Sequence, residues 1–251
     1  MKKVLTGSTL KILAVISMVI DHFAQVVLKN GIILNAPYSR FSDAQFSLLM
    51  NITNICHIAG RIAFPIFCFL LVEGFLHTHD LKKYLLNLGI FAVVSEPVYD
   101  LALKGTLISP DGQNVMFTLL LGLIVLTVIK KACGNIWLGM IVTAAGAFIS
   151  YICRLDGWYY GILLMAVFYF FHDKPVLRNV FAILIMYICG LDFSIRGLIS
   201  PYFITAACSL IFISLYNGKR GMRMKYFFYV FYPAHFIVFY VLSAYIIVPR
   251  L

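Results

Sequence analysis

The sequence predicts an all-α integral-membrane protein, a polytopic bundle of about nine transmembrane helices. Hydrophobic residues make up 62% of the 251 residues, and only 12% are charged. Apolar runs long enough to cross a bilayer recur from one end of the chain to the other. Because lipid offers no partners for backbone N–H and C=O groups, such runs must cross as helices. The short alternating segments of a β-barrel are absent.

Charged residues and turns rich in Gly, Pro and Asn divide the apolar chain into nine spans. The spans cover residues 9–28, 48–76, 82–103, 114–130, 136–153, 157–172, 176–191, 198–216 and 226–247. We expect no soluble domain, so that residues 1–251 form a single membrane domain. No internal repeat stands out, which weakens an interpretation as a secondary transporter built from inverted repeats.

Basic residues are shared unequally between the two ends of the predicted spans. With a cytoplasmic amino terminus, the inner loops hold twelve of the 20 Lys and Arg residues and the outer loops six. This excess predicts a multi-pass protein of the bacterial cytoplasmic membrane with its amino terminus inside. The net charge of +10 then reflects topology, and no nucleic-acid partner is expected. The six cysteines form no C-x-x-C pair, so no metal is expected either.

Polar residues inside the predicted helices share one depth. At 1.5 Å of rise per residue, these groups lie roughly 18–24 Å above the basic inner boundary: His22, Arg61, Glu96, Asn114 and Tyr160. A charge at such depth costs several kcal/mol unless it is paired or hydrated, so the groups should face each other or a water-filled cavity. Adjacent residues point about 100° apart on a helix. We therefore expect Asp21 to pair with Arg61, and His22 to face a carboxylate such as Glu96 or the substrate.

The second span carries a polar stripe and a helix breaker. Asn54, His57 and Arg61 recur at intervals of three and four residues and so lie on one helix face. Pro65 cannot donate a hydrogen bond to the carbonyl of Arg61, four residues earlier. The pattern predicts a kink beside Arg61 that widens a cavity.

Two further histidines lie near features that suggest openings. Glu73 and His77 are four residues apart near the inner end of the second span. They form either a solvated helix end or part of a cytoplasmic mouth. In the ninth span, Pro233 bends the helix beside His235, about 14 Å above the inner boundary. We expect His235 to line a cavity.

Each of these polar residues also has a purely structural interpretation. The Asp21–Arg61 pair could only fix the register of two helices. The other structural roles are a hydrogen-bonded core histidine for His22, the end of a turn before Pro97 for Glu96, an N-cap for Asn114 and an interfacial aromatic residue for Tyr160.

Taken together, the sequence segments resemble the TraX family, which belongs to a wider superfamily of membrane-embedded acyltransferases. The resemblance is carried by "LKILAVISMVIDH", "GRIAFPIFCFLLVEGFLHT", "LKKYLLNLGIFAVVSEPVYDLAL", "QNVMFTLLLGL", "DGWYYGILLM" and "YPAHF". It covers nearly the whole chain. It implies transfer of an acetyl group from cytoplasmic acetyl-CoA, as in amino-terminal acetylation of conjugative pilin. For this chain the acceptor stays open between a peptide amino terminus, another surface amine and a glycan hydroxyl.

The resemblance also assigns roles to residues. His22 of the "DH" pair would be the acyl-transfer histidine, and Asp21, Arg61 and Glu96 would complete the catalytic group. Glu73 and His235 would also shape the site. The residues that we expect to bind substrate or acyl-CoA are Glu73, His77, Asn114, Tyr160, Tyr232 and His235. The lipid bilayer is the remaining partner, and the oligomeric state is left open.

The chemistry of acetyl transfer matches these residue types. A base must remove a proton from the attacking group, and donors must hold the developing oxyanion. A histidine suits the first task, and Arg61, Asn114 or Tyr160 could serve the second. Direct transfer and a covalent acetyl-histidine both remain open. Two rival functions are a small-molecule or ion transporter that uses the same polar layer, and an assembly factor in which the pairs serve folding only.

Overall fold

The computed structural model describes residues 3–132, 134–190 and 194–250, and in these ranges every named element is a helix or helical turn. The predicted all-α bundle is confirmed. The longer helices are α1 (Gly7–Phe23) with its π-helical continuation η1 (Ala24–Ile33), α2 (Asp43–Gly60), α3 (Ala63–His77), α4 (Leu81–Lys104), α5 (Val115–Lys131), α6 (Ile136–Ile152), α7 (Trp158–Phe170), α8 (Pro175–Cys189), α10 (Pro201–Ser214) and α11 (Lys225–Val241) with its continuation η3 (Leu242–Ile247). Short turns are η2 (Tyr38–Arg40), α9 (Ile195–Leu198) and η4 (Val248–Arg250).

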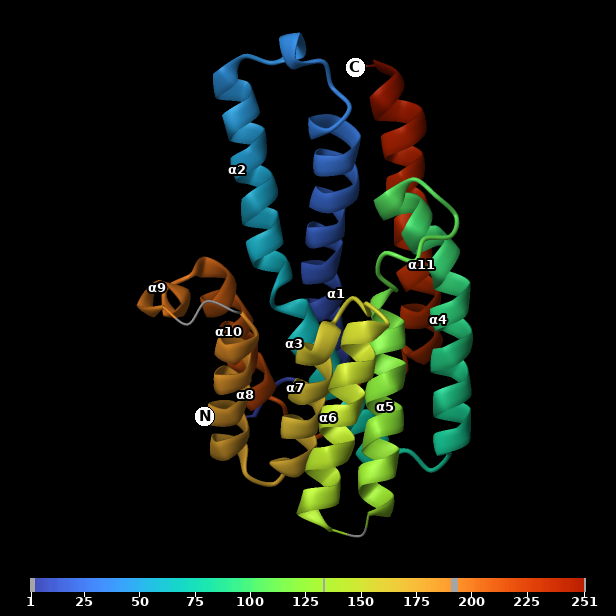
Figure 1. The fold of residues 1–251 in the computed structure, drawn as a ribbon, viewed down its shortest axis with the longest axis vertical. Helices are drawn as coiled ribbons and strands as arrows, with labels where there is room; N and C mark the ends of the chain where they lie inside the picture. Colours follow the sequence, from blue (N-terminus) through green and yellow to red (C-terminus); the bar gives the residue numbers. More distant parts are fainter. Residues whose placement is uncertain (1–2, 133, 191–193, 251) are drawn as a thin grey trace.

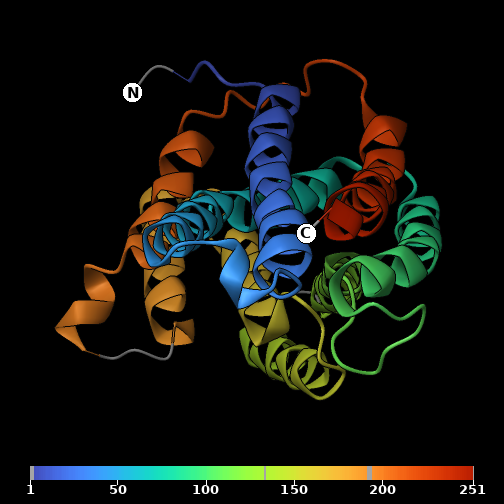
Figure 2. The ribbon, with the colours of Figure 1, turned by 90° about the horizontal axis from the view of Figure 1, so that it is seen from above.

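The helices form a bundle in which some helices extend beyond the others at one end (Figure 1). Helices α5 to α8 and α10 fill the lower half of that view, whereas α2, η1 and the end of α11 rise above them. Seen from above, α1 and η1 run through the middle, between α8 and α10 on one side and α4 and α11 on the other (Figure 2). The contacts of α1 with α2 and α3, and those of α4 with α5 and α11, hold this arrangement.

Four helical stretches of the described chain are long and apolar enough to cross a membrane: Gly7–Ile33, Asp43–His77, Leu81–Lys104 and Tyr226–Arg250. The apolar helices α6, α7, α8 and α10 are shorter, at 13 to 17 residues, which is roughly 20–26 Å at 1.5 Å per residue. Each predicted span coincides with a helix or a pair of consecutive helices. The nine crossings and the cytoplasmic amino terminus remain predictions.

The predicted kink in the second span is confirmed. Helix α2 ends at Gly60 and α3 begins at Ala63, so the break falls at Arg61 and Ile62. The Ser17 hydroxyl donates a hydrogen bond of 2.7 Å to the carbonyl of Ala59 beside the break. A Cβ atom on Gly60 would lie 2.5 Å from the Cβ of Asp21. Glycine is therefore required where α2 meets α1.

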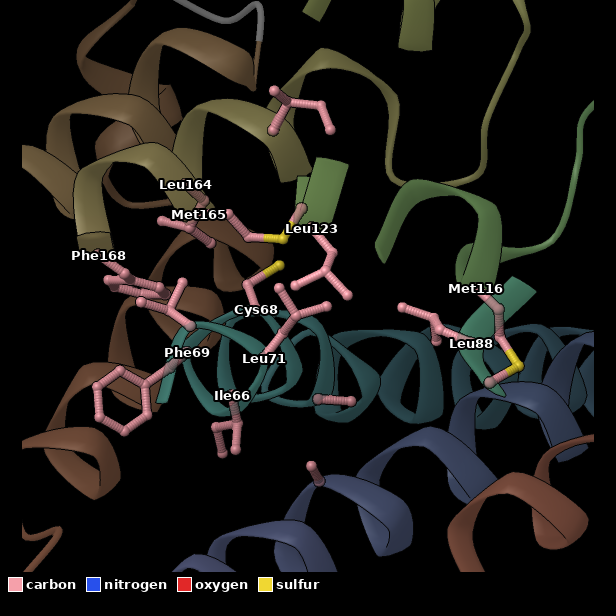
Figure 3. Close-up of a cluster of buried hydrophobic side chains, with 14 of the residues drawn as sticks. Ile66, Cys68, Phe69, Leu71, Leu88, Met116, Leu123, Leu164, Met165 and Phe168 are labelled. Carbon is pink, nitrogen blue, oxygen red and sulfur yellow. The ribbon is translucent and has the colours of Figure 1, made fainter. Parts of the chain in front are cut away.

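The apolar core lies where α3 meets α5 and α7 (Figure 3). Phe69 and Phe168 meet edge to face with ring centroids 5.7 Å apart, and Leu123 is fully buried beside them. Gly122 leaves the space that the end of Met165 fills. This packing fixes α3, which directly follows the break at Arg61, against the second half of α7.

The connections before α5 and before α7 are joined by backbone hydrogen bonds. The Gln113 N–H donates to the carbonyl of Arg154, at 2.9 Å, and the Asp156 N–H donates to the carbonyl of Gln113, at 2.8 Å. The N–H of Gly157 donates to the Thr118 hydroxyl at 3.0 Å. These bonds hold the residues before α7 beside the first turn of α5.

Candidate active site

Two histidines from opposite ends of the sequence meet between α1 and α11. His22 Nδ1 lies 2.7 Å from His235 Nε2, and the two rings stack with centroids 5.0 Å apart. Phe236 packs against both rings, at 4.5 Å from His22 and 4.3 Å from His235. The imidazole of His22 thus faces the bundle interior and not the lipid, as the sequence predicted.

The hydrogen bonds of the pair fix which nitrogens carry protons. His235 Nδ1 lies 3.0 Å from the carbonyl oxygen of Phe231, which can only accept, so Nδ1 of His235 carries its proton. In the neutral ring, His235 Nε2 then accepts, and His22 Nδ1 must donate to it. Nε2 of His22 is left with its lone pair, which is the form that a general base requires.

The predicted Asp21–Arg61 pair is wrong, because Asp21 binds His57. His57 Nδ1 donates to the Asp21 carboxylate at 2.7 Å. Arg61 lies in the break between α2 and α3, where its guanidinium stacks 5.2 Å from the ring centroid of Tyr202. The Tyr202 hydroxyl also donates to Asn54 of the same stripe, and Arg61 stays within electrostatic reach of the Asp156 carboxylate.

Glu96 and Asn114 form a second polar pair, at the start of α5. The Glu96 carboxylate accepts hydrogen bonds from the Asn114 N–H, at 2.9 Å, and from its side-chain amide. The Asn114 side chain also accepts from the Met116 N–H, so the N-cap interpretation is confirmed. Helix α4 continues past Pro97 to Lys104. Glu96 therefore does not end a turn, and no contact joins it to His22 in the described chain.

Asp156, just before α7, connects these pairs and was not singled out from the sequence. The Tyr99 hydroxyl is within hydrogen-bonding range of its carboxylate, and Asp21 is within electrostatic reach. The next residue, Gly157, packs closely against Phe64, because a Cβ atom there would lie 2.4 Å from the Phe64 ring. This close approach holds the adjacent Asp156 near α3. A glycine directly after an aspartate in "DGWYYG" is the signal that could have found it.

Tyr160 packs inside the bundle instead of at its lipid boundary. Its ring centroid is 5.6 Å from that of Phe64, and Arg61 lies within electrostatic reach of its hydroxyl. Asp156 of the connection before α7 is within electrostatic reach of Asp21 and Arg61, and the common depth of the polar groups stays a prediction.

A cavity of about 550 Å³ opens below these polar groups. The basic residues in its lining, Lys11, His77, His79 and Arg220, lie at the end of the bundle where α1 begins and α3 ends, and we call this end the mouth. Its walls are apolar residues of α1, α3, α4, α5 and α11, and its lining reaches Met18, Val115, Met116 and Tyr232. Met18 is one helical turn, roughly 6 Å of rise, below His22. The cavity therefore leads from a basic mouth toward the histidine pair.

Glu73 lines the same cavity near its mouth and connects α3 to the segment after α7. His172 Nε2 donates to the Glu73 carboxylate at 2.7 Å, and His77 Nδ1 donates to the Glu73 carbonyl at 2.8 Å. Arg178 is within electrostatic reach of the carboxylate. Glu73 and His77 both line the cavity, and a cytoplasmic mouth at this end stays a prediction. Among the described residues, no group of three or more His, Cys, Asp or Glu side chains is arranged to hold a metal ion.

Comparison with known proteins places the chain in a family. No solved structure matches the chain. A similar protein is the probable fimbrial assembly protein FimC, serogroup H1, of Dichelobacter nodosus, which is 28% identical over 241 residues, or 90% of this chain and 91% of that protein. Residues 6–243 match the family described as TraX protein, a match that includes Asp21, His22 and His235. The chain therefore belongs to the TraX family.

Proposed function

We propose that the protein is a membrane-embedded acyltransferase that moves an acetyl group from cytoplasmic acetyl-CoA to an amine or hydroxyl at or beyond the membrane. The observation that carries the proposal is the cavity with a basic mouth that ends one helical turn below the His22–His235 pair. A base with an unprotonated nitrogen at the end of a channel suits activation of an incoming nucleophile.

The cavity matches the two chemical parts of an acyl-CoA. Lys11 and Arg220 at the mouth suit the phosphates of the nucleotide, since both are cations of the kind that bind phosphate. The apolar walls suit the pantetheine arm. From Lys11 to His22 is eleven residues of helix, roughly 16 Å of rise, a distance that an extended pantetheine arm spans.

The acceptor substrate would reach His22 from the side of Asp21, Glu96 and Asp156, opposite the cavity. These carboxyl groups give that side an acidic character, which suits a cationic amine better than an anionic group. Because the relative in Dichelobacter nodosus is named as a fimbrial assembly protein, we propose the amino group of a surface-fibre subunit as the first acceptor to test. A surface glycan hydroxyl is the second.

The test is transfer of label from radiolabelled acetyl-CoA to a short peptide with a free amino terminus, using the purified protein in detergent. We expect transfer by the wild type and loss of transfer in His22→Ala, while the variant keeps its unfolding temperature within a few degrees. Mass spectrometry of surface peptides and glycans from cells that carry either protein then identifies the natural acceptor through the loss of one acyl increment. Ion flux without any labelled product would instead support a transporter. No transfer by the wild type, together with a His22→Ala variant that keeps both its abundance and its biological activity, would support an assembly factor.

A further inference from the structure

Tyr232 is the residue at which the cavity and the histidine pair meet. Its ring meets His22 edge to face with centroids 6.4 Å apart, and meets His235 with centroids 5.6 Å apart. The same side chain lines the cavity beside Val115 and Met116. A thioester carbonyl that approaches His22 from the cavity must therefore pass next to Tyr232.

The Tyr232 hydroxyl is a buried polar group whose proton has no acceptor among the described residues. The residue is only 5% exposed, and its hydroxyl has no hydrogen-bond partner among the described residues. Buried hydroxyls normally find a partner, because one left unpaired costs free energy. A hydroxyl without a partner at the end of a substrate-sized cavity is expected where a bound ligand supplies the missing hydrogen bond.

The start of α5 adds a second donor at the same place. Asn114 caps this 17-residue helix, and the N–H of the next residue, Val115, lies beside the Tyr232 hydroxyl. The amino-terminal end of a helix carries partial positive charge, which favours a negative group. Val115 and Tyr232 both line the cavity, so both residues adjoin the space that an acyl thioester would enter.

The oxyanion donors expected from the sequence lie elsewhere. The Asn114 side-chain amide donates to the Ala92 carbonyl and to Glu96 and accepts from the N–H of Met116. Arg61 stacks on Tyr202, and Tyr160 packs on Phe64. Within the described part of the chain, the cavity lining includes Tyr232 but none of those three.

We propose that the Tyr232 hydroxyl, together with the Val115 N–H, forms the oxyanion hole that holds the carbonyl oxygen of the acyl thioester. This inference rests on the proposed acyl transfer. The acceptor nitrogen forms a bond to the carbonyl carbon, the carbonyl electron pair moves onto the oxygen between the two donors, and His22 Nε2 takes the proton from nitrogen. The electron pair on oxygen then re-forms the carbonyl as the carbon–sulfur bond breaks, and the proton held by His22 passes to the departing sulfur, so that CoA leaves as the thiol.

The proposal is tested with Tyr232→Phe, which removes one oxygen atom and keeps the ring. We expect kcat for transfer from radiolabelled acetyl-CoA to the short peptide to fall by about 100-fold or more, the usual effect of losing one oxyanion-hole donor. The Kd for free CoA should stay within about twofold, because the hydroxyl acts on the transition state. The unfolding temperature should equal or exceed that of the wild type, since the hydroxyl lost has no partner in the folded protein. Tyr240→Phe, on the same helix but outside the cavity lining, is the matched control and should leave all three quantities unchanged.

The outcomes separate this inference from the function on which it rests. If Tyr232→Phe keeps kcat within about threefold of the wild type while His22→Ala is inactive, the oxyanion hole is refuted and the acyltransferase stands. If Tyr232→Phe loses CoA binding and unfolds at a lower temperature, Tyr232 is a packing residue and the inference fails. If the wild type itself transfers no acyl group to the peptide or to any surface acceptor, both proposals are refuted.

Discussion

The hydrogen bond between the two histidines makes a quantitative prediction about His235. His235→Phe preserves a ring that can stack on Phe236, as the imidazole does at 4.3 Å, but removes the acceptor that lies 2.7 Å from His22 Nδ1. The Nδ1–H of His22 then loses its partner in a half-buried site, and the ring is free to carry its proton on Nε2 instead. A ring with its proton on Nε2 cannot act as the base at that nitrogen.

The size of the effect follows from the strength of the contact that is lost. A buried donor left without a partner costs about 1–3 kcal/mol, which corresponds to a fall in kcat of roughly 5- to 150-fold. His235→Gln supplies an amide oxygen that can accept from His22 Nδ1, so we expect it to recover most of the activity that His235→Phe loses. The assay is the transfer of label from acetyl-CoA to the peptide, with the unfolding temperature measured for each variant. Equal kcat for the Phe and Gln variants would refute the argument that His235 sets the protonated nitrogen of His22.

Two further predictions concern the packing at the kink and the mouth of the cavity. In Gly60→Ala the new Cβ would lie 2.5 Å from the Cβ of Asp21, so we expect a loss of about 1–3 kcal/mol in stability, measured as a lower unfolding temperature in detergent. Gly89→Ala is the control, because its Cβ would meet only a methyl group of Leu120 at 3.7 Å and should stabilise α4 by up to about 1 kcal/mol. Arg220→Ala should raise KM for acetyl-CoA by about tenfold and leave kcat unchanged, since a phosphate contact stabilises ground and transition states alike. A change in kcat alone would contradict a role in donor binding.

Local sequence features predicted the parts of the structure that depend on a single helix. The long apolar runs predicted the helices, and Pro65 predicted the break between α2 and α3. The cost of ionisable groups in hydrocarbon predicted that His22 faces the interior, where it stacks on His235. Each of these inferences needs only the local pattern and the properties of the bilayer.

Partner choice could not be predicted in the same way, because it depends on how separate helices rotate against each other. His57 and Arg61 are four residues apart and would share a face of a continuous helix. His57 nevertheless reaches Asp21, whereas Arg61 reaches Tyr202, which also binds Asn54 in α2. The neighbours of Asp156 depend on how the connections before α5 and before α7 join. No periodic pattern in the sequence predicts this joining.

The unequal lengths of the helices explain why the site lies where it does. The connections before α5 and α7 return below the tops of α2 and η1 (Figure 1). Irregular backbone within a membrane protein is tolerated only where protein or a water-filled cavity satisfies its polar groups. Here Glu96 accepts from the Asn114 N–H, and the bonds between Gln113 and the residues before α7 satisfy much of the rest. Because α5 and α7 are short, the connections before them need hydrogen-bond partners inside the protein. The same short helices bring the start of α5 and Asp156 near the polar groups of α1. The polar residues of the candidate site therefore also satisfy the backbone hydrogen bonds of these two connections.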